Sequence, residues 1–339
     1  ATAMTLTGTQ NDLNAFLNVA SNIQYTGTLN AAGNDADTIQ VDVTDNGNVG
    51  TGGGGTINFG TVNVDISAVN DDPTNAGGLP SDITVSEDVA SDVDLSAIDL
   101  ADVDSAAGNL TITLTTGGGA LSASSGGGVT VGGTATAMTL TGTQADLNAF
   151  LNVASNIQYT GTLDANGNDV DTIQVDVTDN GNVGTGGGGT INFGTVNVDI
   201  SAVNDDPTNA GGLPSDITVT EDVASDVDLS AIDLSDVDSA AGNLTITLTT
   251  GGGALSATSG GGVTVGGSAT AMTLTGTQND LNAFLNVASN IQYTGTLNAA
   301  GNDADSIQVD VTDNGNVGTG GGGTINFGTV NVDIAAVND

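Results

Sequence analysis

The stretch "NLTITLTT" at residues 109–116 alternates Leu110, Ile112 and Leu114 with threonine. Successive side chains of a β-strand point to opposite faces, so this alternation places the apolar side chains on one face. The stretch "DTIQVDVTD" at residues 171–179 has the same alternation. Both stretches therefore predict strands with one buried face and one polar face.

Two neighbouring segments depart from simple alternation. In "GTINFGTVNVDISAV" (189–203) the apolar positions change phase at Gly194, which predicts a β-bulge there. Thr143 and Asp146 have the spacing of a helix capping box, and apolar residues follow at helical spacing. We therefore expect one short helix at about residues 144–153.

The sequence repeats itself. Met4, Met138 and Met272 begin nearly identical runs, which gives a period of 134 residues. A period of this size predicts a whole domain per repeat, because solenoid repeats are far shorter. We divide the chain into a half unit (1–71), a middle unit (72–205) and a last unit (206–339), the half unit being the C-terminal half of a repeat.

Glycine-rich segments separate the strand signals. Residues 117–128 and 184–190 are expected to form hairpin loops. Phosphate-binding loops would need a following helix and usually a cation, and the calcium-binding β-roll repeat would need aspartates that these segments lack. About six to eight short strands and one helix per unit predict a Greek-key β-sandwich. The expected fold class is thus all-β, with tandem sandwiches and one short helix per repeat.

Composition excludes several classes of function. The chain has 40 acidic residues, no Lys, Arg or His, and no Cys. Nucleic acids and anionic membrane surfaces are poor partners for such a chain, because their phosphates bind Lys and Arg. Disulfides and lysine chemistry are also excluded. No export signal, anchor or membrane-inserting run is evident, so we expect a segment of a longer secreted protein.

Three further segments carry a family resemblance: "SEDVASDVDLSAIDLADVDSAAGNLTITL" (86–114), "VDVTDNGNVGTGG" (175–187) and "VNVDISAVND" (196–205). Together they resemble a cadherin-type repeat, and more closely the cadherin-like tandem repeats of giant bacterial surface adhesins. The resemblance extends over each unit from its first strand to its last. It implies an immunoglobulin-like or cadherin-like sandwich with calcium bound between successive domains.

The resemblance also implies which residues bind calcium. They are the Glu that ends the first strand, an Asp-x-Asp loop with a following Asn, the Asp after the penultimate strand, and the linker. In this sequence the predicted ligands are Glu87, Asn70, Asp71, Asp72, Asp102, Asp104, Asn109, Asp179, Asn204, Asp205, Asp206, Asp236, Asp238, Asn243 and Asp313, with Glu221 and Asp45 in equivalent positions. The linker departs from the family pattern, since Ala68 or Ala202 stands where an Asp is expected. A further acidic motif is only partly echoed by "LDANGND" (163–169).

Alternating strand directions would bring the bottom of one unit to the top of the next. At the 205/206 junction this would gather Glu87, Asn204, Asp205, Asp206, Asp236, Asp238, Asn243 and Asp313. Two carboxylates about 4 Å apart repel by about 4 kcal/mol at an effective dielectric of about 20. Ca²⁺ takes about six to eight oxygen ligands and would offset that repulsion. The alternative is that these Asp and Asn residues only form turns, which they favour in any β protein.

We therefore expect a non-catalytic extracellular or cell-surface protein, an extender rod of a large surface adhesin whose tandem repeats calcium makes rigid. Its expected partners are calcium ions and the neighbouring repeats of the same chain. The alternative is a subunit of an extracellular filament, matrix fibre or surface layer, assembled by β-strand complementation between chains. A glycosidase would need two distinct carboxylates, and nothing in the sequence singles out such a pair.

Overall fold

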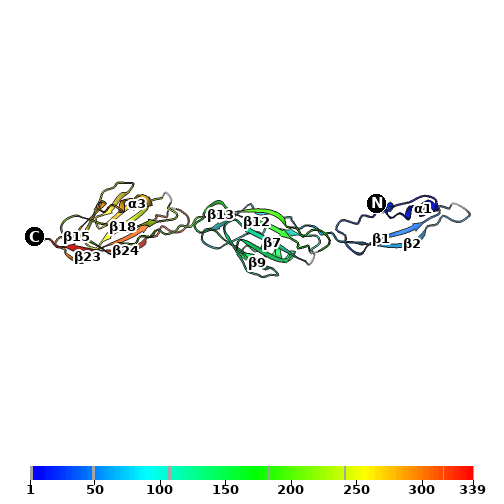
Figure 1. Ribbon diagram of the computed structural model, residues 1–339, viewed down its shortest axis with the longest axis horizontal. Helices are drawn as coiled ribbons and strands as arrows, with labels where there is room; N and C mark the ends of the chain where they lie inside the picture. The colour runs from blue at the N-terminus through cyan, green and yellow to red at the C-terminus, as the bar shows by residue number, and fades with distance from the viewer. Residues whose placement is uncertain are drawn as a thin grey trace.

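The computed structural model describes residues 3–47, 50–105, 108–181, 183–239, 242–315 and 317–338. Asp339, which ends the last linker-like motif, lies outside the described residues. Figure 1 shows three bodies in a row, with the half unit at one end and the last unit at the other. None of the helices in the described part of the chain has the length and apolar character needed to cross a bilayer.

The two complete units repeat the same elements in the same order, and the half unit contains four of them. The half unit contains α1 (Gln10–Leu17), the 3-10 turn η1 (Ala20–Asn22), β1 (Gly33–Val43) and β2 (Ile57–Ile66). The middle unit contains β3 (Thr74–Asn75), β4 (Asp82–Ser86), β5 (Ser91–Asp92), β6 (Leu100–Ala101), β7 (Asn109–Thr116), β8 (Ala120–Ala123), β9 (Thr130–Thr134), β10 (Ala137–Thr143), α2 (Gln144–Leu151), η2 (Ala154–Asn156), β11 (Ile157–Thr160), β12 (Gly167–Thr178) and β13 (Ile191–Ser201). The last unit contains β14 (Thr208–Asn209), β15 (Asp216–Thr220), β16 (Ser225–Asp226), β17 (Leu234–Ser235), β18 (Leu244–Thr250), β19 (Ala254–Ala257), β20 (Thr264–Ser268), β21 (Ala271–Gly276), α3 (Gln278–Leu285), η3 (Ala288–Asn290), β22 (Ile291–Thr294), β23 (Gly301–Thr312) and β24 (Ile325–Ala335).

Each complete unit is a sandwich of a large and a small sheet. In the middle unit the large sheet has the order β4-β13-β12-β7-β10-β9, the small sheet has the order β5-β11-β8, and β3 pairs with β6. The last unit repeats this arrangement with β15-β24-β23-β18-β21-β20, β16-β22-β19 and β14-β17. β4 runs parallel to β13, whereas the other pairs of the large sheet are antiparallel. The fold is all-β, an Ig/cadherin-like Greek-key sandwich with one short α-helix per repeat.

The structure confirms most of the local predictions and contradicts one in part. Strands occupy 109–116 and 167–178, as the alternation predicts, and the phase change at Gly194 is a bulge where β13 slips against β12. The helix spans Gln144–Leu151, and the hydroxyl of its N-cap Thr143 accepts the N–H of Asp146. The prediction of a loop over 117–128 was wrong in part, because β8 lies inside that segment and pairs with β11. The leucine within those glycines is enough to anchor a short strand to the core.

Each complete unit encloses its own apolar core. The first core gathers buried side chains from Ile83 to Ile200, and the second gathers their counterparts from Ile217 to Ile334. The alternating residues of β7 and β12 point into this core, which is why their sequence pattern is so regular. Each core also includes one buried tyrosine, Tyr159 or Tyr293.

Tyr159 is held by an aspartate that also binds a glycine turn. The Tyr159 hydroxyl donates to Asp171 at 2.7 Å, and the N–H groups of Gly117, Gly118 and Gly119 donate to the same carboxylate at 2.8–3.1 Å. A Cβ on Gly119 would lie 2.1 Å from the Tyr159 hydroxyl oxygen, so the turn needs glycine there. Burial alone would raise the pKa of Asp171, but these hydrogen bonds outweigh it and lower that pKa.

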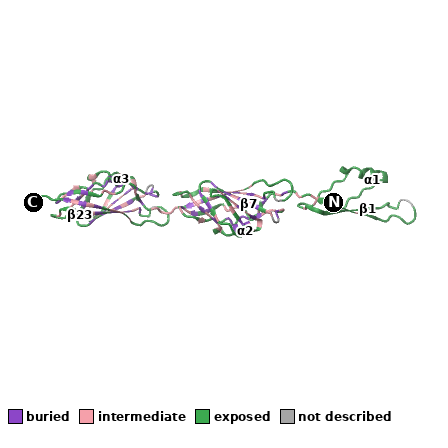
Figure 2. Ribbon diagram, turned by 60° about the horizontal axis from the view of Figure 1, so that its bottom comes forward, coloured by how far each residue is buried: buried purple, intermediate pink, exposed green. Residues whose placement is uncertain are grey.

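The half unit has the same apolar residues without the strands that cover them. Val62 is 55% exposed, whereas its counterpart Val196 in the middle unit is fully buried. Ile39 is likewise 39% exposed against 0% for Ile173. Figure 2 shows this contrast along the molecule, with buried residues in the two complete units and an exposed half unit.

Candidate metal centre at the junctions between units

Sheet topology decides which loops meet at a junction. β4 ends beside the end of β13, since Ser86 pairs with Ser201. At the opposite end of the sandwich, the start of β7 lies beside the end of β12, since Thr111 pairs with Thr178. The Asp-x-Asp loop before β7 and Asp179 after β12 therefore share the end that receives the preceding linker. The last unit repeats this geometry.

Three carboxylates from two units converge at the 205/206 junction. Glu87 directly follows β4 of the middle unit, Asp205 lies in the linker, and Asp238 lies in the Asp-x-Asp loop of the last unit. One oxygen of each lies within 4.8 Å of the other two. Glu87 is 0% exposed, and both of its carboxylate oxygens are buried without a hydrogen-bond donor.

Glu221 is the same residue one repeat later, and it belongs to none of the carboxylate clusters among the described residues. Its Oε1 accepts the backbone N–H of Val337 at 2.7 Å. Glu87 has no such donor, and its carboxylate lies near Asp205 and Asp238 instead. Glu221 thus has the same position in its unit without the acidic neighbours, so it serves as a control for Glu87.

Asp205 also belongs to a second group of three carboxylates, with Asp88 and Asp164. The N–H of Asp164 donates to Asp88 at 3.1 Å, so the two loops carrying them are joined. Neither residue is among the predicted ligands. The motif "LDANGND" (163–169) contains Asp164 and was the one feature of the sequence that pointed to this loop. The other two copies have Asn30 and Asn298 in place of Asp164.

The side chain of Asp236 holds the Asp-x-Asp loop in its turn. Asp236 accepts the N–H groups of Asp238 and Ser239 on Oδ1 at 3.0 and 3.1 Å, while Gln278 at the start of α3 accepts the Asp236 N–H at 3.1 Å. The other oxygen of Asp236 is buried without a donor. Asp238 accepts the backbone N–H of Asp205, which ties the loop to the linker.

The linker asparagine connects to the aspartate that follows the penultimate strand. The Asn204 side-chain amide donates to Asp313 and to the carbonyl of Asp205. Asp313 is 1% exposed, and its second oxygen accepts the N–H of Gly315 at 3.0 Å. The amide oxygen of Asn204 is buried and has no donor, so it is available to a ligand.

The 71/72 junction repeats most of these contacts. The Asp71 N–H donates to Asp104 at 2.8 Å, and the Asn70 amide donates to the buried Asp179. Asp102 accepts the N–H of Asp104 at 3.1 Å and keeps one buried oxygen without a donor. No counterpart of Glu87 precedes this junction in the 339 residues.

Several predicted ligands lie at the margin of the sites. Asp72 and Asp206 are exposed, although Asp72 lines the same shallow pocket as Asp71 and Asp102. Asn109 and Asn243 are also exposed, and their backbone carbonyls accept side-chain amides of Asn180 and Asn314 at 2.8 and 2.7 Å. Asp45 is exposed and accepts the N–H of Gly47 at 3.0 Å.

The electrostatics of the junctions follow from burial and proximity. Burial, reinforced by the charges of Asp238, Asp88, Asp164 and Glu87, raises the pKa of Asp205. Burial likewise raises the pKa of Asp236, with contributions from Asp313 and Asp238, and it raises that of Asp102. These carboxylates are thus harder to ionise than free ones unless positive charge is supplied. The chain has no Lys, Arg or His side chain to supply it.

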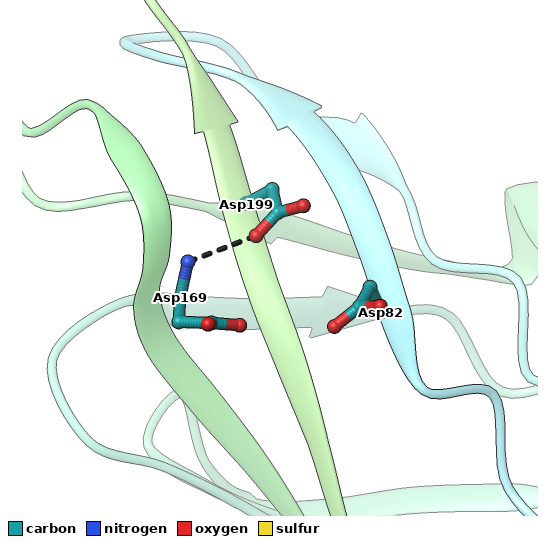
Figure 3. Close-up of side chains that lie close together, drawn as sticks. All are labelled: Asp82, Asp169 and Asp199. Atoms are coloured by element: carbon teal, nitrogen blue, oxygen red, sulfur yellow. Dashed lines mark hydrogen bonds between the residues drawn. The ribbon is translucent and has the colours of Figure 1, made fainter.

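A third kind of carboxylate cluster lies on the large sheet away from the junctions. Asp82 of β4, Asp169 of β12 and Asp199 of β13 lie side by side across three neighbouring strands (Figure 3). Asp216, Asp303 and Asp333 repeat the cluster in the last unit. Two members of each cluster are exposed and the third is half-buried, so water solvates these charges. We assign no ligand to them.

Comparisons with known proteins give only distant structural likeness. No protein-family model and no curated protein sequence matches the chain. A protocadherin gammaB7 EC3-6 cis-dimer structure is 12% identical, with a TM-score of 0.36 over 88% of this chain and 57% of that one. The titin domains z1z2 in complex with telethonin are 13% identical, with a TM-score of 0.22 over 80% of this chain and all of that one. An endo-fucoidan hydrolase of glycoside hydrolase family 107 is 12% identical, with a TM-score of 0.21 over 89% of this chain and 34% of that one.

Proposed function

We propose that this chain is a non-catalytic structural segment of an extracellular or cell-surface protein, an extender rod of a large surface adhesin. Its sandwich units are joined end to end, and Ca²⁺ held at the junctions limits their relative motion. Such a rod would hold an adhesive module away from the cell. The partners of this segment would be calcium ions and neighbouring repeats.

One observation carries the proposal. In the described part of the chain, seven buried side-chain oxygens have no hydrogen-bond partner, and all seven lie at the two junctions. They belong to Asn70, Glu87, Asp102, Asn204, Asp205 and Asp236. Buried polar atoms normally have partners, because desolvating one without compensation costs about 1–3 kcal/mol. Six residues of one chemical class, carboxylate or amide oxygen, suit a hard cation such as Ca²⁺.

The choice of Ca²⁺ over Mg²⁺ rests on geometry. The junction offers carboxylates and an amide oxygen from three separate segments, the end of β4, the linker and the next Asp-x-Asp loop. Ca²⁺ accepts such an irregular set, whereas Mg²⁺ demands a tight octahedron and retains its water. At a hundredfold excess over its dissociation constant, Ca²⁺ should stabilise the folded state by about 2.7 kcal/mol by mass action.

Melting temperatures test this proposal directly. We expect the order Ca²⁺ above Mg²⁺ above chelator, measured by calorimetry at constant ionic strength. Equal melting temperatures in all three solutions would mean that water alone solvates the junction carboxylates.

A second candidate is an extracellular filament, matrix fibre or surface layer assembled by strand complementation between chains. Val62 and Ile39 are exposed where their counterparts are buried, so a segment resembling residues 72–134 would cover them. Sedimentation of residues 1–71 mixed with a peptide of residues 72–134 would show a complex if such complementation occurs between chains. Failure of the two to associate would remove this candidate.

A further inference from the structure

The linker between units makes a second set of contacts that involves no carboxylate. Val203 forms a parallel β-bridge with Thr319, which lies in the glycine-rich loop between β23 and β24. The Thr319 N–H donates to the carbonyl of Ala202 at 3.1 Å, and the Asn204 N–H donates to the carbonyl of Thr319 at 3.2 Å. Every atom in these two hydrogen bonds belongs to the backbone.

The 71/72 junction has the same pair of contacts. Val69 bridges to Thr185, whose N–H donates to the carbonyl of Ala68 at 3.1 Å. The carbonyl of Thr185 accepts the N–H of Asn70 at 3.3 Å. This geometry explains why alanine can occupy the first linker position, because the residue contributes its carbonyl rather than a side chain.

Glycine in the loop makes room for the linker. A Cβ on Gly321 would lie 2.0 Å from the amide nitrogen of Asn204, and one on Gly318 would lie 2.7 Å from the carbonyl carbon of Val203. Their φ values are +61° and +87°, in the left-handed region that favours glycine. The linker therefore packs directly on the loop backbone.

The half unit contains a third copy of the loop, and within the described part of residues 1–339 no linker contacts it. Its "GTGGGG" (50–55) is identical to 184–189 and 318–323. Gly187 and Gly321 have φ values of +66° and +61°, whereas the equivalent Gly53 does not lie in the positive range. Among the positive-φ glycines of the three loops, only this position differs, and it is the one that lies against the side-chain amide of the linker asparagine.

We propose that each "GTGGGG" loop is a docking site for the Ala-Val-Asn linker of the preceding unit, and that it holds the linker whether or not a cation is bound. Because both hydrogen bonds are neutral and use only the backbone, they do not depend on the charge of the neighbouring carboxylates. The loop fixes the register of the linker, and the acidic cluster lies beside it. This inference does not rest on the proposed calcium function.

Amide hydrogen exchange in the full chain tests the proposal, with ¹⁵N-threonine labelling and chelator in 0.15 M NaCl. Thr→Ser substitution at each position assigns its signal. We expect Thr185 and Thr319 to exchange at least about fivefold more slowly than Thr51, the factor that one backbone hydrogen bond of about 1 kcal/mol supplies. Equal exchange of all three would overturn the proposal.

Three glycine variants separate contact from backbone strain. Gly321→Ala should bring Thr319 to the rate of Thr51 and leave Thr185 protected. Gly320 has a φ of +89° and Gly323 has no positive φ, and a Cβ on either meets no atom within 4 Å. Gly320→Ala therefore tests strain alone, and Gly323→Ala is the neutral control. Both should keep Thr319 protected.

Thr247 in β18 reports whether the last unit remains folded. If the chelator unfolds that unit, the same variants are compared in calcium, where Gly321→Ala should still accelerate the exchange of the Thr319 amide. Protection of Thr319 that survives Gly321→Ala, or that is lost equally in Gly320→Ala, would show that the loop is not a docking site.

Discussion

Replacing Glu87 by Gln should have opposite effects with and without calcium. The substitution keeps the shape of the side chain and removes one of three negative charges whose oxygens lie within 4.8 Å of one another. Without a divalent cation, this charge is repelled and fully buried. The variant should therefore be more stable than the wild type in chelator and bind Ca²⁺ more weakly.

The magnitude follows from the spacing. At 4.8 Å and an effective dielectric of about 20, each carboxylate pair repels by about 3 kcal/mol. Removing Glu87 eliminates two of the three pairs, but Asp205 is only half-buried and water screens its share. We expect a gain of about 1–2 kcal/mol in chelator, or a rise of about 4–8 °C in the melting temperature of the middle unit. Loss of a charged ligand should weaken Ca²⁺ binding at least about tenfold.

Calorimetry in chelator and calcium titration of the same samples give both quantities. Glu221→Gln is the matched control, because it removes the same charge from a carboxylate that belongs to no acidic cluster among the described residues. The control should leave calcium affinity at the 205/206 junction unchanged. It should also lose stability in chelator, since Glu221 accepts the Val337 N–H at 2.7 Å. If Glu87→Gln shifts neither the melting temperature nor the calcium affinity, Glu87 is not a calcium ligand and does not destabilise the junction.

Three further predictions concern individual carboxylates. The double variant Asp236→Asn with Asp238→Asn should weaken calcium binding in titration calorimetry and leave the fold intact. The control Asp146→Asn should cost about 0.3–1 kcal/mol of helix capping without changing calcium affinity. Equal calcium affinity in the two variants would show that the Asp-x-Asp loop is only a turn. Asp171→Asn should destabilise by about 2 kcal/mol at pH 7 in urea unfolding, because charge-assisted hydrogen bonds to Tyr159 and the glycine turn are lost, and an unchanged midpoint would contradict this. Because the folded-state pKa of Asp171 is lowered, its contribution to the free energy of unfolding is present above the unfolded pKa of 3.8 and is lost as pH falls through the folded pKa. The folded-state pKa of Asp205 is raised, so the opposite holds at the junction. The stability that protonated Asp205 gives is present at low pH and is lost as pH rises through its folded pKa. In chelator, the average dimension of residues 72–339 in small-angle scattering should therefore increase as pH falls from 7 towards 4, because protonation reduces the repulsion at the junction. An unchanged dimension would contradict this pH dependence.

The sequence predicts those parts of the fold that local pattern encodes. The alternation in residues 109–116 predicts strand β7, because residues two positions apart in a strand point to the same face and here every second residue is buried. Thr143 predicts the start of α2 through its capping geometry. The two-residue strands β3 and β5 have no such signal, since two residues cannot show a period. Their pairing depends on the finished sandwich.

The candidate site was predictable only through the family resemblance. Nothing in the local sequence around Glu87 indicates that its carboxylate meets Asp238 of the next unit. Asp88 and Asp164 were missed because their contact with Asp205 depends on how two loops of the same unit lie against the linker. The role inferred for Gly321 could not be predicted from the sequence either, since a run of glycines predicts a loop but not the segment that packs on it.

Small-angle X-ray scattering of residues 72–339 tests the central claim most directly, because this fragment contains two complete cores and the whole 205/206 junction. With Ca²⁺ the two units should scatter as one extended rod. With chelator, repulsion among Glu87, Asp205 and Asp238 should loosen the junction, giving a shorter average dimension and a broader distance distribution. Identical scattering profiles in the two solutions would contradict a calcium-stiffened junction.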